Sequence, residues 1–120
     1  MIFRFDSFEL DTESFVLSAS GSEVPVQPRA LDVLIHLIRN RHRLVDKEEL
    51  LAGPWGGAAV TDTAIHQALL LVRRALADTG APQRFVKTIR GKGFRFIATV
   101  SVDERAQAQA QRTDETLMPR

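Results

Sequence analysis

The sequence of 120 residues predicts an α+β domain in which short antiparallel strands precede three helices and a C-terminal β-hairpin. Residues 2–26 hold small apolar clusters between polar residues, with a turn signal at Gly21-Ser22. Residues 28–78 carry apolar side chains at helical spacing, and residues 85–98 hold two β-favouring runs around a Gly-Lys-Gly turn. This order of elements fits one small domain.

The N-terminal clusters predict a small antiparallel meander with one buried face. Its apolar residues are Phe3, Phe5, Phe8, Leu10, Phe15, Val16, Leu17, Val24 and Val26. Pro25 has no N–H group for a sheet ladder, so its segment is expected at a sheet edge.

The first two predicted helices each have a start signal. The first begins near Pro28, and its buried stripe consists of Leu31, Leu34, Ile35 and Ile38. The second begins at Asp46, a good N-cap, with Glu49 three residues later as in a capping box. It ends by Gly53-Pro54, before a glycine-rich loop that contains the only Trp.

The third predicted helix runs from Thr63 to Asp78, with Thr61 or Asp62 as its cap and Gly80 and Pro82 as its terminators. Its core stripe is Ile65, Leu69, Val72 and Leu76. At about 100° per residue, the opposite side carries Thr63, Gln67, Leu70 and Arg74, flanked by His66, Leu71 and Arg73.

Basic residues concentrate in the second half of the sequence. From Arg73 to Arg95 there are seven basic residues and one acid, Asp78. Charge alone is equally compatible with a solvated face and with a surface for a polyanion. The predicted hairpin adds five basic residues that no acid interrupts: Arg84, Lys87, Arg90, Lys92 and Arg95.

Strand alternation predicts that Val86, Thr88 and Arg90 share one face of the hairpin and that Phe85, Lys87 and Ile89 share the other. Gly91 and Gly93 permit a tight tip that a phosphate backbone can approach closely. An Arg at such a tip can enter a minor groove.

A short second helix, a turn and a longer third helix form a helix-turn-helix candidate. In such a motif one helix lies in the major groove, where Gln and Arg form bidentate hydrogen bonds to adenine and guanine edges. The competing interpretation is that these polar residues only keep a surface helix soluble.

Four segments resemble the OmpR/PhoB-type winged helix-turn-helix domain, especially that of CadC/ToxR-like one-component regulators: VPVQPRALDVLIHLI, RLVDKEELLAGPW, VRRALAD and the wing TIRGKGFRFIA. The resemblance covers residues 3–98. It implies a four-stranded N-terminal sheet, three helices, a C-terminal hairpin wing, a third helix in the major groove and a wing Arg near the minor groove.

The same resemblance implies roles for particular residues. Thr88 and Arg90 match wing contacts, and Arg73 matches a helix Arg that meets the DNA backbone. The loop from Gly53 to Val60 would touch phosphate through backbone near Trp55, or would touch RNA polymerase. Two copies would occupy half-sites about one helical turn apart.

Leu70 and Leu71 depart from the family, which commonly has polar or basic residues there. Leu70 could contact thymine methyl groups in the major groove. Alternatively, the two leucines could bind protein, including a second copy of the chain.

Other functional classes lack a motif. The three His residues, His36, His42 and His66, have no ligand spacing, there is no Cys, and no catalytic or nucleotide-binding motif occurs. We therefore expect no metal, no cofactor and no enzymatic activity. Without a signal peptide or a long apolar run, we expect a cytoplasmic protein with no membrane segment in this chain.

The sequence thus predicts a winged-helix domain at residues 1–100 and a disordered tail or linker at residues 101–120. The predicted function is sequence-specific regulation of transcription on double-stranded DNA. The alternative is a winged-helix protein-interaction module that uses the leucine face. The candidate DNA contacts are Thr63, His66, Gln67, Leu70, Arg73, Arg74, Lys87, Thr88, Arg90, Lys92 and Arg95, with Trp55 in the loop.

Overall fold

The computed structural model describes residues 1–58, 60–78 and 84–103. These residues form two compact units, one of residues 1–23 with residues 99–103 and one of residues 24–98. Within the described ranges, no helix is long and apolar enough to cross a membrane.

The first unit is built on an antiparallel sheet. Its strands are β1 (Ile2–Phe5), β2 (Phe8–Asp11), β3 (Val16–Ala19), β4 (Ser22–Val24) and β7 (Ser101–Asp103), in the order β4-β3-β2-β1-β7. The register pairs apolar residues across the strands, Phe3 with Leu10 and Leu10 with Leu17, and all three are buried. One face of the predicted meander is therefore buried, and β4 lies at the edge, as the position of Pro25 indicates.

The sheet has one strand more than the four that the family resemblance implies. Residues 101–103 were expected to begin a disordered tail, but they form β7 and pair with β1. Arg4 bridges the strands on either side of β1, because its guanidinium contacts Glu9 of β2 at 2.7 Å and Asp103 of β7 at 2.8 Å. Residues 104–120, the rest of the expected tail, lie outside the described residues.

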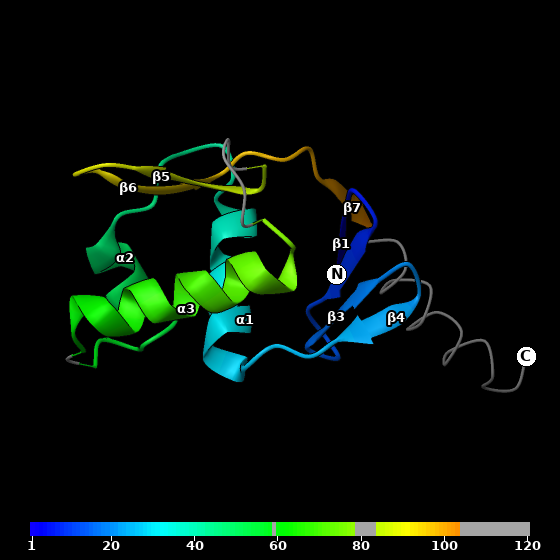
Figure 1. Ribbon diagram of the computed structural model, residues 1–120, viewed down its shortest axis with the longest axis horizontal. Helices are drawn as coiled ribbons and strands as arrows, with labels where there is room; N and C mark the ends of the chain where they lie inside the picture. The colour runs from blue at the N-terminus through cyan, green and yellow to red at the C-terminus, as the bar shows by residue number, and fades with distance from the viewer. Residues whose placement is uncertain (59, 79–83, 104–120) are drawn as a thin grey trace, which may run out of the picture. The chain divides into compact units, whose positions relative to one another are not determined.

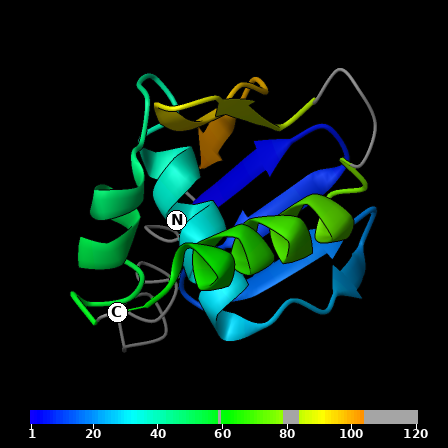
Figure 2. The same ribbon diagram turned by 60° about the vertical axis from the view of Figure 1, so that its left-hand side comes forward.

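The second unit contains the helices α1 (Pro28–Arg39), α2 (Lys47–Ala52) and α3 (Asp62–Ala75), and the hairpin of β5 (Val86–Ile89) and β6 (Gly93–Phe96). Helix α3 crosses α1, and α2 lies beside the N-terminal end of α3 (Figure 1). The same arrangement is visible after rotation, with the hairpin above the helices (Figure 2). The unit therefore places a helix pair and a hairpin next to each other.

The helix boundaries follow the predicted signals at their starts. Pro28 is the first residue of α1, Asp46 caps α2, and the Thr61 hydroxyl accepts the Ala64 N–H at 3.3 Å as the cap of α3. Both predicted core stripes are buried throughout: Leu31, Leu34, Ile35 and Ile38 in α1, and Ile65, Leu69, Val72 and Leu76 from α3 to its C-cap.

Helix α3 ends three residues before the predicted end at Asp78. Ala77 adopts a left-handed conformation with φ of 55°, which turns the chain out of the helix. The N–H groups of Ala77 and Asp78 then bond to the carbonyls of Arg74 and Arg73, at 3.1 and 2.7 Å, in the pattern of a Schellman motif. The predicted terminators, Gly80 and Pro82, lie outside the described residues.

Candidate nucleic-acid interface

Besides its core stripe, helix α3 has three sides with different surroundings. Thr63, Gln67, Leu70 and Arg74 are all exposed, as their helical positions predict. His66 and Arg73 face the hairpin, since the His66 ring meets the Phe94 ring edge-on at 6.2 Å and Arg73 bonds to Thr88. Leu71 and Arg74 line a shallow depression with the segment Val24–Gln27. The structure thus leaves one polar stripe of α3, interrupted by Leu70, open to a ligand.

The hairpin of β5 and β6, which we call the wing, has a buried and an exposed face. Its register pairs Val86 with Phe96 and Thr88 with Phe94, and these phenylalanines are buried. Lys87 lies directly opposite Arg95, and both side chains are exposed. The predicted sharing of faces is correct for Val86 and Thr88. It is wrong for Phe85, which is buried like Val86, because β5 begins one residue after it.

The wing carries cations without internal counter-charges. Within the described ranges, Lys87, Arg90, Lys92 and Arg95 form no ion pair with an acidic side chain. Like charges directly opposite each other on adjacent strands destabilise a hairpin. The Lys87–Arg95 pair therefore costs folding free energy that an external anion would recover.

Arg73 and Thr88, both predicted DNA contacts, contact each other. Arg73 donates a hydrogen bond to the Thr88 hydroxyl, and the same nitrogen lies 3.3 Å from the Val86 carbonyl oxygen. Burial lowers the pKa of the Arg73 guanidinium, and the charge of Asp78 opposes that shift. Arg73 is therefore a link between α3 and the wing, in addition to any contact with a ligand.

Asp78 fixes the start of the wing. Its side chain is 2% exposed and accepts the backbone N–H groups of Arg84, Phe85 and Val86 at 2.6, 2.9 and 2.9 Å. Burial alone would raise its pKa, but these three donors, together with the charge of Arg73, outweigh burial and hold the pKa below its usual value. From the sequence, Asp78 was distinguished as the one acid among seven cations. It was also the predicted end of the third helix, whereas α3 ends at Ala75 and leaves the Asp78 side chain free to bond to the wing.

Gly93 serves a close contact inside the protein. Its φ is +149°, and an added Cβ would lie 2.2 Å from the carbonyl oxygen of Val45. Val45 and Phe94 exchange two backbone hydrogen bonds of 2.8 Å, so the segment before α2 pairs with β6. Gly91, in contrast, has φ of +74° and open space around it. A phosphate backbone can therefore approach the tip at Gly91, as predicted, whereas the Val45 backbone already fills the space beside Gly93.

Glu49 anchors α2 rather than completing a capping box. Its N–H bonds to Asp46 as predicted, at 2.8 Å, but its carboxylate bonds to His36 of α1 at 2.6 Å and to Arg43 at 2.6 and 2.7 Å. The bonds to Arg43, and then to His36, outweigh burial and lower the pKa of Glu49 to about 2. No local sequence signal predicts this network, because its members are separated along the chain and meet only when α1 and α2 pack.

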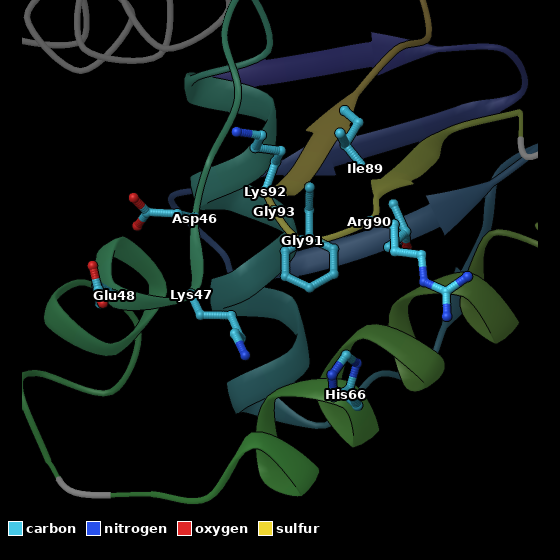
Figure 3. Close-up of a pocket in the computed structure, with 11 residues that line it drawn as sticks. Asp46, Lys47, Glu48, His66, Ile89, Arg90, Gly91, Lys92 and Gly93 are labelled. Atoms are coloured by element: carbon cyan, nitrogen blue, oxygen red, sulfur yellow. The ribbon is translucent and has the colours of Figure 1, made fainter.

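A cleft of about 460 Å³ lies between α2, α3 and the wing. His66 points from α3 toward the wing, Lys47 and Glu48 come from the start of α2, and Arg90 and Lys92 come from the wing tip (Figure 3). Lys47 pairs with Asp62 at 2.9 Å, and Asp46 is used as the cap. The remaining cations thus border an open cleft beside the exposed stripe of α3.

The loop at Trp55 is closed by its own hydrogen bonds. The N–H groups of Trp55, Gly56, Gly57 and Ala58 all bond to carbonyls within residues 50–55. The Arg29 guanidinium lies 5.4 Å from the centre of the half-buried Trp55 ring. A phosphate contact through the backbone here would have to break one of these bonds.

Comparisons with known proteins place the chain in a family. The family model described as "Transcriptional regulatory protein, C terminal" matches residues 21–96. The transcriptional regulatory protein KdpE of Mycobacterium tuberculosis is 35% identical over 98 residues, which are 81% of this chain and 43% of KdpE. The transcriptional regulator HilA of Salmonella typhi is 31% identical over 100 residues, 83% of this chain and 18% of HilA. The chain thus spans less than half the length of either relative.

Solved structures agree on the fold. The DNA-binding domain of Klebsiella pneumoniae RstA, in complex with the RstA box, superposes with a TM-score of 0.71 at 23% identity, covering 80% of this chain and 96% of that domain. The predicted winged helix-turn-helix fold is confirmed. Because the family model covers more than half of its residues, this chain belongs to the family of transcriptional regulatory protein C-terminal domains, of the OmpR/PhoB type.

Proposed function

We propose that this domain binds double-stranded DNA in a sequence-specific manner and serves as the output module of a transcriptional regulator. The observation that carries the proposal is the exposed pair of Lys87 and Arg95, directly opposite each other on the wing. A pair of this kind is unfavourable in the free protein and becomes favourable beside a polyanion. Family membership and the DNA-bound RstA domain of the same fold support the same ligand.

In this proposal α3 lies in the major groove. Thr63, Gln67 and Arg74 are exposed on one stripe, and Gln and Arg pair with adenine and guanine edges. Leu70 lies among them, and His66 flanks the stripe on the side of the wing. These side chains would supply base preference.

The wing would supply affinity for DNA of any sequence. Arg90 and Lys92 lie at the tip, where the arginine can enter a minor groove, and Lys87 and Arg95 can meet phosphates along the exposed face. Arg73 and Thr88 would contact the DNA backbone together, since they are already hydrogen-bonded to each other. Base recognition would then come from α3, and sequence-independent affinity from the wing of the same unit.

Binding to a labelled random-sequence duplex, measured by fluorescence anisotropy over a salt series, tests the proposal. The wild type should bind, and its affinity should fall steeply with salt because cations displace counterions from DNA. Arg90→Ala should bind more weakly with a salt slope smaller by about 1. Arg39→Ala removes the same charge from an exposed position outside the wing and serves as the control. No binding at low salt would refute the proposal.

We further propose that the loop of residues 53–60 contacts RNA polymerase. The backbone N–H groups of residues 55–58 are used internally, which favours a side-chain surface over a phosphate site there. Trp55→Ala should leave duplex affinity unchanged and reduce regulated transcription in a purified system. A parallel loss of duplex affinity would instead place Trp55 at the DNA.

Assembly and location follow from the same function. Two copies would bind half-sites about one helical turn apart, so affinity for paired sites should fall when five base pairs are inserted between them. A regulator that acts on bacterial DNA works in the cytoplasm, through binding rather than catalysis. Equal affinity for paired and single sites would argue for a monomer.

A further inference from the structure

Within α3, all of which lies in the described residues, Leu70 is the one large apolar side chain that is exposed. It is 44% exposed, whereas Ile65, Leu69 and Val72 of the same helix are buried. Gln67 and Arg74, the neighbours of Leu70 on the exposed stripe, are both polar. A lone exposed leucine needs no partner for folding, but on the stripe proposed to enter the major groove it offers a small apolar surface to the DNA.

The small extent of this apolar surface decides between two kinds of partner. A stable protein interface buries about 800 Å² on each partner, spread over about 20 residues. Leu70 has polar neighbours along the stripe, and Leu71 beside it is half-buried in the depression with residues 24–27. Such a surface is too small for a second copy, but it matches a single methyl group.

The major groove offers one such group, the C5-methyl of thymine. We propose that Leu70 is a specificity-determining residue that contacts a thymine methyl group in the DNA site. This inference rests on the proposed function, and it names a chemical group that the polar residues of the stripe do not read. Hydrogen bonds from Gln67 and Arg74 would select bases by their edges, and Leu70 would add a preference for thymine.

The helix geometry also places this thymine. Gln67 and Leu70 are three residues apart, which is about 4.5 Å along the helix axis. Base pairs are stacked about 3.4 Å apart. The thymine should therefore lie one base pair, or at most two, from the base pair that Gln67 contacts.

The test begins with selection of preferred sites by the wild type from a random duplex pool. Each thymine of the selected site is then replaced singly by deoxyuridine, which removes the methyl group and keeps every hydrogen-bonding group. At one position the affinity of the wild type should fall about fourfold, as expected for one buried carbon group. The Leu70→Ala variant should bind the thymine duplex and the deoxyuridine duplex with about equal, weaker affinity. Leu44→Ala, at another exposed leucine, should keep the wild-type response.

Replacing the same thymine by 5-methylcytosine and by cytosine provides a second measurement. The wild type should bind the methylated duplex more tightly than the unmethylated one, and Leu70→Ala should not distinguish them.

These outcomes separate the proposed function from the proposed role of Leu70. If the wild type selects no sequence, the proposed function fails and this inference fails with it. If it selects a site but no methyl removal weakens binding, or if Leu70→Ala responds like wild type, only the role of Leu70 is overturned. Loss of self-association in Leu70→Ala with an unchanged thymine response would assign the residue to a protein contact.

Discussion

The Arg73 guanidinium of α3 donates a hydrogen bond to the Thr88 hydroxyl of β5, and so joins the helix proposed for the major groove to the wing proposed for the minor groove. The same nitrogen reaches the Val86 carbonyl at 3.3 Å, while Nε of Arg73 is buried without a partner in the part of the chain that the structure describes. The orientation of the wing relative to α3 therefore depends on this side chain.

Substitutions at this link should show coupled effects. Thr88→Val removes the hydroxyl acceptor and should lower the free energy of unfolding by about 1 kcal/mol. Arg73→Lys should cost more, because one Arg73 nitrogen makes both contacts, and the lysine side chain is one atom too short to place its nitrogen there. Urea denaturation of both variants and of the double variant measures the coupling. Strictly additive losses would show that the hydrogen bond contributes nothing to stability.

The Lys87–Arg95 pair should lower the stability of the fold and raise its affinity for duplex DNA. Lys87→Gln relieves repulsion across the strands and should raise the free energy of unfolding by about 0.2–1 kcal/mol. The same change should weaken duplex binding and reduce its salt slope by about 1. Lys47→Gln is the matched control, because it breaks the ion pair with Asp62 and should not stabilise the fold. Stability and affinity that both fall in Lys87→Gln would contradict the interpretation of the pair as a ligand site.

The two glycines of the wing tip should differ in tolerance. Gly93→Ala places a Cβ 2.2 Å from the Val45 carbonyl oxygen, so the domain should lose at least about 2 kcal/mol of stability. Gly91→Ala meets no neighbouring atom and should lose only about 1 kcal/mol, from its left-handed backbone. Thermal melts followed by circular dichroism compare the two. Equal losses would mean that the contact with Val45 does not constrain the tip.

Acid should destabilise the domain through Glu49. Its folded pKa of about 2 lies below the ordinary value of 4.5, so its contribution is complete above about pH 4.5 and is lost as the pH falls toward 2. In Glu49→Gln the unfolding free energy should change less steeply over this range, by up to about 1.4 kcal/mol per pH unit for one proton. Glu48→Gln, at the exposed neighbouring position, should follow the wild type. Melting temperatures from pH 2 to 6 measure the difference, and identical slopes for Glu49→Gln and wild type would exclude Glu49 as the acid-sensitive group.

Local sequence determined the helices and the polar stripe of the interface. The spacing of Ile65, Leu69, Val72 and Leu76 fixes which side of α3 is buried, and therefore which side carries Gln67 and Arg74. Asp46 and Thr61 could be recognised as caps, because a capping side chain bonds to backbone within three residues of itself. The assignment of these exposed residues to DNA contacts stays a prediction.

Only the tertiary structure decided how separated residues meet. Ser101–Asp103 became a strand because β1 offers a free edge and Arg4 a charge, neither of which is visible in the short segment itself. The Glu49 carboxylate bonds to His36 and Arg43 instead of to its own helix end. Position 93 must be glycine because the Val45 backbone leaves no room for a Cβ. Periodicity and capping act within a few residues, whereas hydrogen bonds and steric contacts across the fold depend on where packing brings distant segments together.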